Sequence, residues 1–144
     1  MKVSMKLDYG VRVLVDLAQH YGQGVIPASE IASRQGIPEP YLDQILVALR
    51  RAGFVTSKRG PQGGHMLAQP PSQVNLGEVI NALEGSPSPR CIAQPEDCDR
   101  ATVCVQREVW QAIEEAAQKL LRATTLGELV ERQERRSEVS MYYI

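Results

Sequence analysis

The 144-residue sequence has few aromatic residues and no long hydrophobic run. Aromatic residues make up only 5% of it, so a core built from its 43% of hydrophobic residues must be mainly aliphatic. No apolar stretch reaches the roughly 18 residues of a membrane-spanning helix, and the N-terminus lacks the apolar region and cleavage site of a signal peptide. We therefore expect a cytoplasmic protein that has no membrane partner.

The sequence also has little net charge, only −1, which taken alone argues against nucleic-acid binding. The charges are unevenly distributed, however. Residues 1–64 carry a balance of +3, and residues 65–144 carry a balance of −4. A locally positive region is the electrostatic footprint that DNA binding requires, so the first half of the chain is compatible with this function.

Patterns typical of enzymes are missing as well. The sequence has no nucleophile–base pair and no paired carboxylates in a cleft pattern. Residues 60–64 are rich in glycine, but no Lys-Ser/Thr follows to open a helix, as a phosphate-binding loop requires. We therefore predict that the protein is not an enzyme.

Residues 28–67 hold the most informative pattern that is present. A short helix is predicted over 28–34, a glycine-bearing break follows, and a second helix runs from about Pro40 to Ala52. Proline is tolerated in a first helical turn because its missing N–H has no helical partner there. The second helix has one apolar face at helical spacing, formed by Leu42, Ile45, Leu46 and Leu49. Two helices joined in this way predict a helix-turn-helix.

A basic, glycine-rich hairpin is predicted directly after these helices. Residues 54–57 have strand composition, residues 58–64 read Lys-Arg-Gly-Pro-Gln-Gly-Gly, and residues 65–67 can return as a second strand. This arrangement indicates a wing, with the preceding helix in a major groove and the wing on the backbone or minor groove. An ordinary helix pair with a mobile loop is the alternative. From their charge, we predict phosphate contacts by Arg50, Arg51 and Lys58.

Helical patterns flank this region on both sides. Residues 5–21 predict an opening helix with Asp8 in its first turn, where an acid stabilises the helix dipole. Residues 25–26 can add a short strand to the wing, and residues 75–83 predict a further short helix. A long helix is predicted over 102–123, and a short one follows before the charged tail.

The long helix carries an apolar stripe of about five turns, or roughly 30 Å. The stripe consists of Val109, Ile113, Ala116 and Leu120. It is too long for a small winged-helix core to cover, so a second copy of the chain is the simplest cover. The alternative is a helix that packs wholly on its own domain.

All three cysteines lie within 14 residues, CIAQPEDCDRATVC, at the spacing C-x6-C-x5-C. The segment is polar and cannot easily bury three unrelated thiols. Converging thiolates are suitable ligands for zinc or an iron–sulfur cluster. Either site requires a fourth ligand, which this segment does not supply. A thiol redox switch, which needs only two of the three cysteines, is the alternative. The spacing does not choose iron over zinc.

These features together resemble the IscR/NsrR-type winged-helix transcription regulators of bacteria. The resemblance covers nearly the whole chain. It is carried by the three-cysteine segment and by the strings at residues 8–11 (DYGV), 41–46 (YLDQIL), 59–64 (RGPQGG), 76–80 (LGEVI) and 125–129 (TLGEL).

The resemblance implies a homodimer that binds a palindromic site in double-stranded promoter DNA. By position, the recognition-helix residues that meet bases correspond to Tyr41, Asp43 and Gln44. Arg59, followed by Gly60, matches the wing residue that enters the minor groove.

The resemblance also implies an iron–sulfur cluster whose state changes DNA affinity, with ligands matching Cys91, Cys98 and Cys104. We expect a [2Fe–2S] rather than a [4Fe–4S] cluster. Some relatives use a histidine three residues after the last cysteine as the fourth ligand, but Arg107 stands there and cannot ligate. Others use an aspartate from the first helix of the partner subunit, and Asp8 matches that position.

Two further departures from the family pattern stand out. The first cysteine gap is six residues instead of five, so the loop must bulge. The recognition helix begins with Pro38-Glu39-Pro40 and lacks the hydroxyl residues of some relatives, so their promoter sequence does not transfer.

The sequence thus predicts a mainly α fold with a small β-hairpin wing. Its expected parts are a winged helix-turn-helix domain (1–84), a cysteine-bearing loop (85–104), a dimerisation helix with a short C-terminal helix (105–130) and a charged tail (131–144). The predicted function is a DNA-binding transcription regulator controlled by an iron–sulfur cluster. The competing interpretations are a zinc site or thiol redox switch on the same fold, and a regulatory subunit that contacts only proteins.

Overall fold

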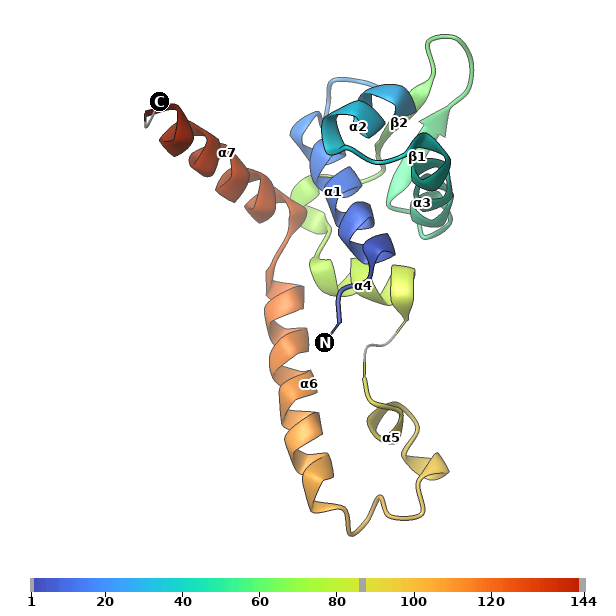
Figure 1. Cartoon of the computed structure of the whole chain (residues 1–144), viewed down its shortest axis with the longest axis vertical. Coiled ribbons are helices and arrows are strands. Elements are labelled where there is room, and N and C mark those ends of the chain that lie inside the picture. The colour runs from blue at the N-terminus through green and yellow to red at the C-terminus, as the bar shows by residue number, and fades with distance from the viewer. Residues whose placement is uncertain (1, 86–87, 143–144) are drawn as a thin grey trace.

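The computed structural model describes residues 2–85 and 88–142, and places a hairpin at one end of the molecule and a cysteine-bearing segment at the other (Figure 1). The expected cysteine-bearing loop (85–104) and the charged tail (131–144) therefore lie partly outside the described residues, at positions 86, 87, 143 and 144. The elements are, in order, α1 (Met5–Gln19), α2 (Ala28–Gln35), α3 (Glu39–Arg51), β1 (Val55–Lys58), β2 (Gly64–Leu67), η1 (Pro71–Gln73), α4 (Leu76–Glu84), α5 (Arg90–Ala93), η2 (Pro95–Asp97), α6 (Val105–Ala123) and α7 (Leu126–Tyr142). The mainly helical fold with its hairpin is the one that the sequence predicts.

Helices α2 and α3 form the predicted helix-turn-helix. Gly36 ends α2 in the left-handed conformation, with φ of 63°, and its N–H donates to the carbonyl of Ala32. Glycine adopts this conformation without the steric cost of a side chain. Helix α3 has Pro40 in its first turn and buries the four predicted aliphatic residues, so the opposite face is left free for contacts outside the domain.

The predicted wing is an antiparallel pair of β1 and β2, in which Val55 lies opposite Leu67 and Ser57 opposite His65. Ile26 joins the other edge of β2, exchanging two backbone hydrogen bonds of 2.8 and 2.9 Å with His65. A Cβ atom at Gly64 would lie 2.4 Å from the carbonyl oxygen of Ile26. This close backbone approach therefore requires glycine.

Aliphatic side chains dominate the core, as the low aromatic content predicts. Among the buried hydrophobic side chains of the described residues, Phe54 alone is aromatic. Leu14 and Leu17 of α1 belong to the same buried cluster as Leu42 and Leu49 of α3, and all four are almost inaccessible to solvent. The core therefore holds α3 from behind and fixes the position of its outer face.

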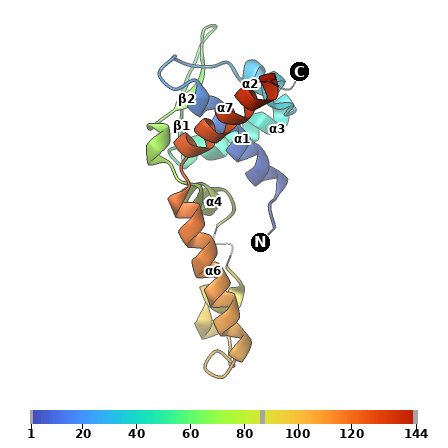
Figure 2. The same ribbon diagram turned by 90° about the vertical axis from the view of Figure 1, so that its left-hand side faces the viewer.

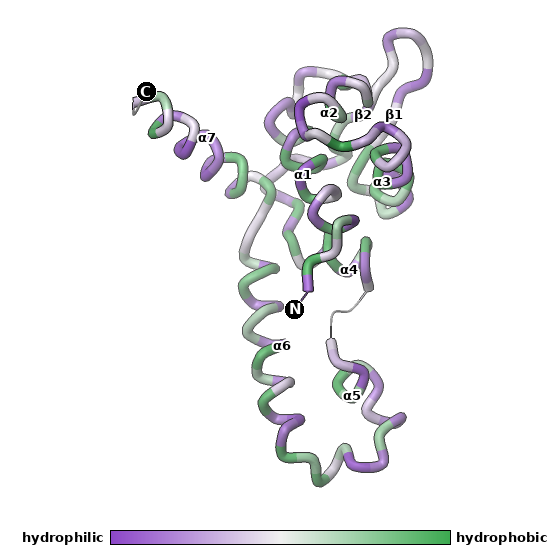
Figure 3. Tube along the Cα trace, in the orientation of Figure 1, coloured by the Kyte–Doolittle hydropathy of each residue, from purple (hydrophilic) through white to green (hydrophobic). Residues whose placement is uncertain are grey.

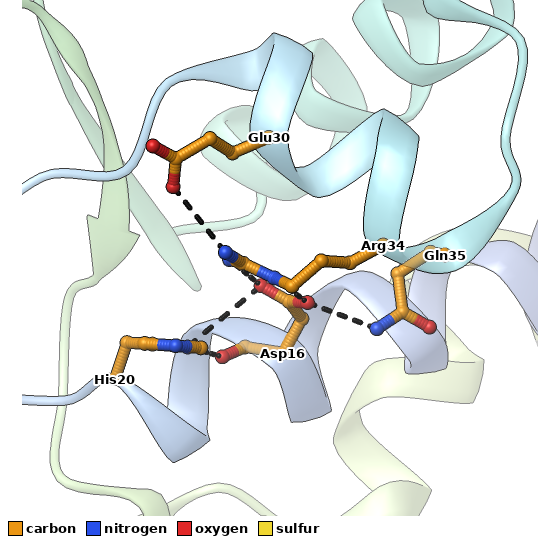
Figure 4. Close-up of polar contacts among 5 residues, drawn as sticks. All are labelled: Asp16, His20, Glu30, Arg34 and Gln35. Atoms are coloured by element: carbon orange, nitrogen blue, oxygen red, sulfur yellow. Dashed lines mark hydrogen bonds and ion pairs between the residues drawn. The ribbon is translucent and has the colours of Figure 1, made fainter.

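A buried ion pair ties α1 to α2 (Figure 4). The Asp16 side chain is 2% exposed and accepts hydrogen bonds of 2.9 and 2.7 Å from Arg34 Nε and Nη2. Gln35 Nε2 donates a third, at 2.9 Å, and His20 Nδ1 lies 2.8 Å from the Asp16 carbonyl oxygen. Burial raises the pKa of Asp16, but these hydrogen bonds and the charges of Arg34 and His20 outweigh it, so the pKa lies below its ordinary value.

Helix α7 differs from the prediction of a short helix followed by a charged tail, because it continues to Tyr142. Its first turns are anchored by Leu126, which is fully buried, and by Leu129 and Val130, which pack against the core. The charged continuation is supported by pairs four residues apart, Glu128 with Arg132 and Glu131 with Arg135. Such pairs stabilise a helix that has begun on a packed face.

Helix α6 projects from the domain and carries the cysteine segment beside its far end (Figures 1 and 2). It begins at Val105, three residues later than predicted. The C-terminal end of α6 is joined to the domain by two backbone hydrogen bonds. Leu76 N donates to Thr124 O at 3.0 Å, and Leu126 N donates to Val74 O at 2.9 Å. No helix in the described part of the chain combines the length and apolar character needed to cross a membrane.

Candidate functional site

The outer face of α3 presents the three residues that the sequence assigns to base contacts. Tyr41, Asp43 and Gln44 are exposed, whereas their neighbours Leu42 and Ile45 are buried. The helical period produces this separation, because the buried residues lie on the stripe that faces the core. A polar face with an aromatic ring, a carboxylate and an amide can meet base edges and their apolar groups.

The predicted basic residues surround this face. Arg50 and Arg51 occupy the last turn of α3, and Lys58 ends β1. Arg59 and Gly60 follow in the wing tip, where Gly60 has a φ of 113° and accepts a hydrogen bond from Gly63 N. All five residues are exposed, so the end of α3 and the wing tip both offer positive charges that suit a phosphate backbone.

Tyr9 and His65 also lie near this surface, and the sequence motifs assign neither of them a role. The Tyr9 ring of α1 lies against Tyr41, and the Arg12 guanidinium carbon lies 5.5 Å from the centre of the Tyr9 ring. His65 of β2 lies next to the wing tip, and its Nδ1 is 2.7 Å from Ser57 Oγ. The aromatic and histidine identities were visible in the sequence, but only the packing of α1 and the hairpin register bring these residues to the surface.

The cysteine segment lies at the opposite end of the molecule from the hairpin (Figure 1). All three cysteines are free thiols that are partly exposed. Cys91 and Cys98 line one open hollow with Arg90, Gln94 and Asp97, whereas Cys104 lines another. The segment is not the continuous loop that the sequence indicates, because α5 and η2 form within it.

The structure does not gather the three thiols. Within residues 2–85 and 88–142, no three histidine, cysteine, aspartate or glutamate side chains lie close enough together to hold a metal ion. Thiolates repel one another until a cation joins them, and metal sites often form together with the metal. The donor set nevertheless fits an iron–sulfur cluster in kind, since thiols are its usual ligands.

Asp8 is separate from the cysteines of its own chain. Its carboxylate forms an ion pair of 2.9 Å with Arg12 four residues later, and both side chains are about half exposed. Arg107 stays close to the cysteine segment, where its Nη1 donates to the carbonyl of Ala101 at 3.2 Å. Arg107 thus restrains the chain before Cys104.

Comparison with known proteins identifies the class to which this fold belongs. The model of the Rrf2 family, described as iron-dependent transcriptional regulators, matches residues 3–132. The chain belongs to this family, as the resemblance in its sequence predicts. Its relatives are transcriptional regulators, and this agrees with the prediction that it is not an enzyme.

Individual relatives are similar over most of their length. The transcriptional regulator CymR of Bacillus subtilis is 35% identical over 144 residues, which cover 100% of both chains. The regulator IscR of Aliivibrio salmonicida is 35% identical over 90% of this chain and 77% of its own. The solved structure of T. potens IscR matches with a TM-score of 0.78 and 38% identity, covering 94% of this chain and 90% of that one. The CymR structure, described as that of the global cysteine regulator of B. subtilis, also gives a TM-score of 0.78, at 36% identity over 92% of this chain and 98% of that one.

Proposed function

We propose that the protein is a homodimeric regulator that binds promoter DNA and whose affinity is controlled by an iron–sulfur cluster on Cys91, Cys98 and Cys104. The observation that carries the proposal is the donor set. Three free thiols occur within 14 residues of one polar segment, in a chain that matches iron-dependent transcriptional regulators. The exposed face of α3 and the basic wing supply a surface suited to DNA.

The proposed dimer interface is the apolar stripe of α6. Val109 is 56% exposed, Ile113 55% and Leu120 67%, so the domain leaves the stripe uncovered. Hydrophobic positions recur along α6 in Figure 3. Removing such side chains from water contributes about 25 cal/mol for each Å² of apolar surface buried. Pairing of two α6 helices would bury the stripe and place two α3 helices on one duplex.

In this arrangement, the cluster would occupy the far end of α6, with Asp8 of the partner subunit as the proposed fourth ligand. When bound, the cluster supplies a redox-sensitive cross-link between thiolates. The chain contributes the orientation of those thiolates, through the turn of α5, the Arg107 contact and the start of α6 at Val105. Because α1 packs against α3, a constraint on α1 would bear on the angle between the two recognition helices.

Thiol oxidation is a second candidate for the control of DNA binding. It is favoured by the placement of Cys91 and Cys98 on one hollow, apart from Cys104. The chain is also similar over its full length to CymR, whose structure is described as that of a cysteine regulator and not as that of an iron–sulfur protein. A switch of this kind needs two thiols and an oxidant, without any metal.

The test is anaerobic purification followed by visible absorbance, Mössbauer spectroscopy and iron, sulfide and zinc analysis. We expect a coloured protein containing iron and sulfide, and a changed affinity for a duplex from its own promoter after the cluster is removed. Single Cys→Ala variants at 91, 98 and 104 should each lose the absorbance. A colourless protein after reconstitution with iron and sulfide contradicts the cluster. A disulfide between Cys91 and Cys98 that changes DNA affinity would instead support the thiol switch.

A further inference from the structure

We propose that His65 is a DNA-phosphate contact that takes up a proton when the protein binds a duplex. The inference rests on the proposed DNA-binding function and adds a residue that the recognition motifs do not assign. It follows from the position of His65 in the hairpin, the groups around it and its hydrogen bond to Ser57.

Hairpin register places His65 on the inner face of the wing. Side chains alternate along a strand, so His65 shares a face of β2 with Leu67, which is buried against the core. His65 lies two residues closer to the wing tip than Leu67, beyond the edge of the core, and it is partly exposed. It therefore lies beside the basic wing tip, on the side that faces the helices.

The charged groups that act on His65 come from the recognition helix. Burial lowers the pKa of His65 below its ordinary value of 6.5, the positive charge of Arg50 lowers it further, and the negative charge of Asp43 opposes both. The neighbouring segment at Ile26 contributes only backbone groups. Helix α1 also contacts β2, but its Asp16 is already bound both to Arg34 and to His20.

The hydrogen bond to Ser57 is compatible with both charge states of His65. A hydroxyl can donate to a neutral ring nitrogen or accept from a protonated one. Protonation therefore does not require the ring to break its 2.7 Å contact with Ser57. Within the described residues no hydrogen bond engages Nε2, which is a donor in the imidazolium and can serve a phosphate oxygen.

DNA would reverse the electrostatic balance at this position. In the free protein, the positive charge of Arg50 disfavours a positive charge on the neighbouring His65. Phosphates that approach Arg50 and Lys58 neutralise this field, so the pKa of His65 rises in the complex. Binding then takes up a proton, and affinity increases as the pH falls toward the pKa of the free state, by at most about tenfold per pH unit for one proton.

The test uses the full chain and a short duplex of mixed sequence at low salt, because phosphate contacts do not depend on sequence. The chain has two histidines, His20 and His65, so a His20→Gln variant assigns the NMR signals. We expect the pKa of His65 to rise when DNA is added, whereas the NMR signals of His20 should not respond to DNA. We also expect affinity to increase about threefold to tenfold between about pH 7.5 and about pH 6 in the parent and in His20→Gln.

Two variants fix the charge at position 65. His65→Gln should lose the pH dependence and bind at low pH as the parent binds at high pH. His65→Lys should bind tightly at both pH values, because its charge is permanent. A pKa of His65 that does not change with DNA, or a His65→Gln variant that keeps the parent's pH dependence, overturns the proposal. A parent that binds no duplex at all contradicts the proposed function itself.

Discussion

The ring of Tyr9 on α1 meets the ring of Tyr41 on α3 edge to face, with centroids 5.5 Å apart and planes at 81°. Tyr41 is 37% exposed on the face assigned to base contacts, so Tyr9 supports a recognition residue from behind. We expect Tyr9→Leu and Tyr41→Leu to be coupled by about 0.5–1.5 kcal/mol in a double-mutant cycle of urea unfolding. Additive effects of the two substitutions would show that the rings contribute only independent burial.

The Asp16–Arg34 pair predicts a strong effect on stability. Arg34→Met would leave a buried carboxylate without its main partner, and we expect a loss of roughly 2–4 kcal/mol in the free energy of unfolding. Arg135→Met is a matched control, because the Arg135–Glu131 pair is exposed. Its effect should stay below about 1 kcal/mol. Equal effects of the two substitutions would contradict the structural role assigned to Asp16.

The same pair predicts a dependence of stability on pH. Since the folded-state pKa of Asp16 lies below the ordinary 3.8, its contribution is present above that value and is lost as the pH falls through the folded-state pKa. Asp16→Asn should remove this component of acid unfolding, as measured by urea titrations at several acidic pH values. An acid-unfolding slope identical to the parent's would show that Asp16 does not contribute.

Arg59 and Lys58 should differ in their effects on DNA binding. Arg59→Ala removes a charge from the wing tip and should weaken promoter binding markedly while the fold stays intact. Lys58→Ala should weaken binding uniformly and reduce the salt slope by about one unit. Footprinting titrations at several salt concentrations measure both effects. Unchanged promoter affinity in Arg59→Ala would contradict the assignment of the hairpin as a DNA-binding wing.

Ile113→Asp should prevent dimerisation. It places a charge without a partner in the proposed interface on α6, and we expect monomers or aggregates and lost DNA binding. Val139 on α7 is exposed to the same 55%, so Val139→Asp is the control and should remain dimeric. Sedimentation measures the oligomeric state. A stable dimer of Ile113→Asp would mean that this stripe is not the interface.

Asp8→Ala should assemble a cluster that is held weakly and has a shifted absorbance spectrum, if Asp8 is the fourth ligand. Arg12→Ala removes the same 2.9 Å ion pair but keeps the carboxylate, so its spectrum and cluster lifetime should resemble the parent's. Asp8→Ala protein with the parent's spectrum and lifetime would return Asp8 to the role of an acid near a helix N-terminus.

Much of the candidate DNA-binding surface could be predicted because the signals for its helices and hairpin are local. The apolar period of residues 42–49 separates the buried face of α3 from Tyr41, Asp43 and Gln44, and glycines and basic residues mark the hairpin. The length of helix α7 was underestimated because the signals that would reveal it are not local. Its charged second half has no apolar period, and its anchor is the burial of Leu126, Leu129 and Val130 against distant elements.

The sequence by itself determined the aliphatic core, the helix-turn-helix with its wing and the presence of three cysteines in one short segment, since each follows from residue types at short spacing. Tertiary structure alone decided which distant residues meet. It pairs Asp16 with Arg34 and Tyr9 with Tyr41, and it places His65 within the electrostatic field of Arg50. Such contacts depend on how helices pack and strands register, and no local period in the sequence encodes that geometry.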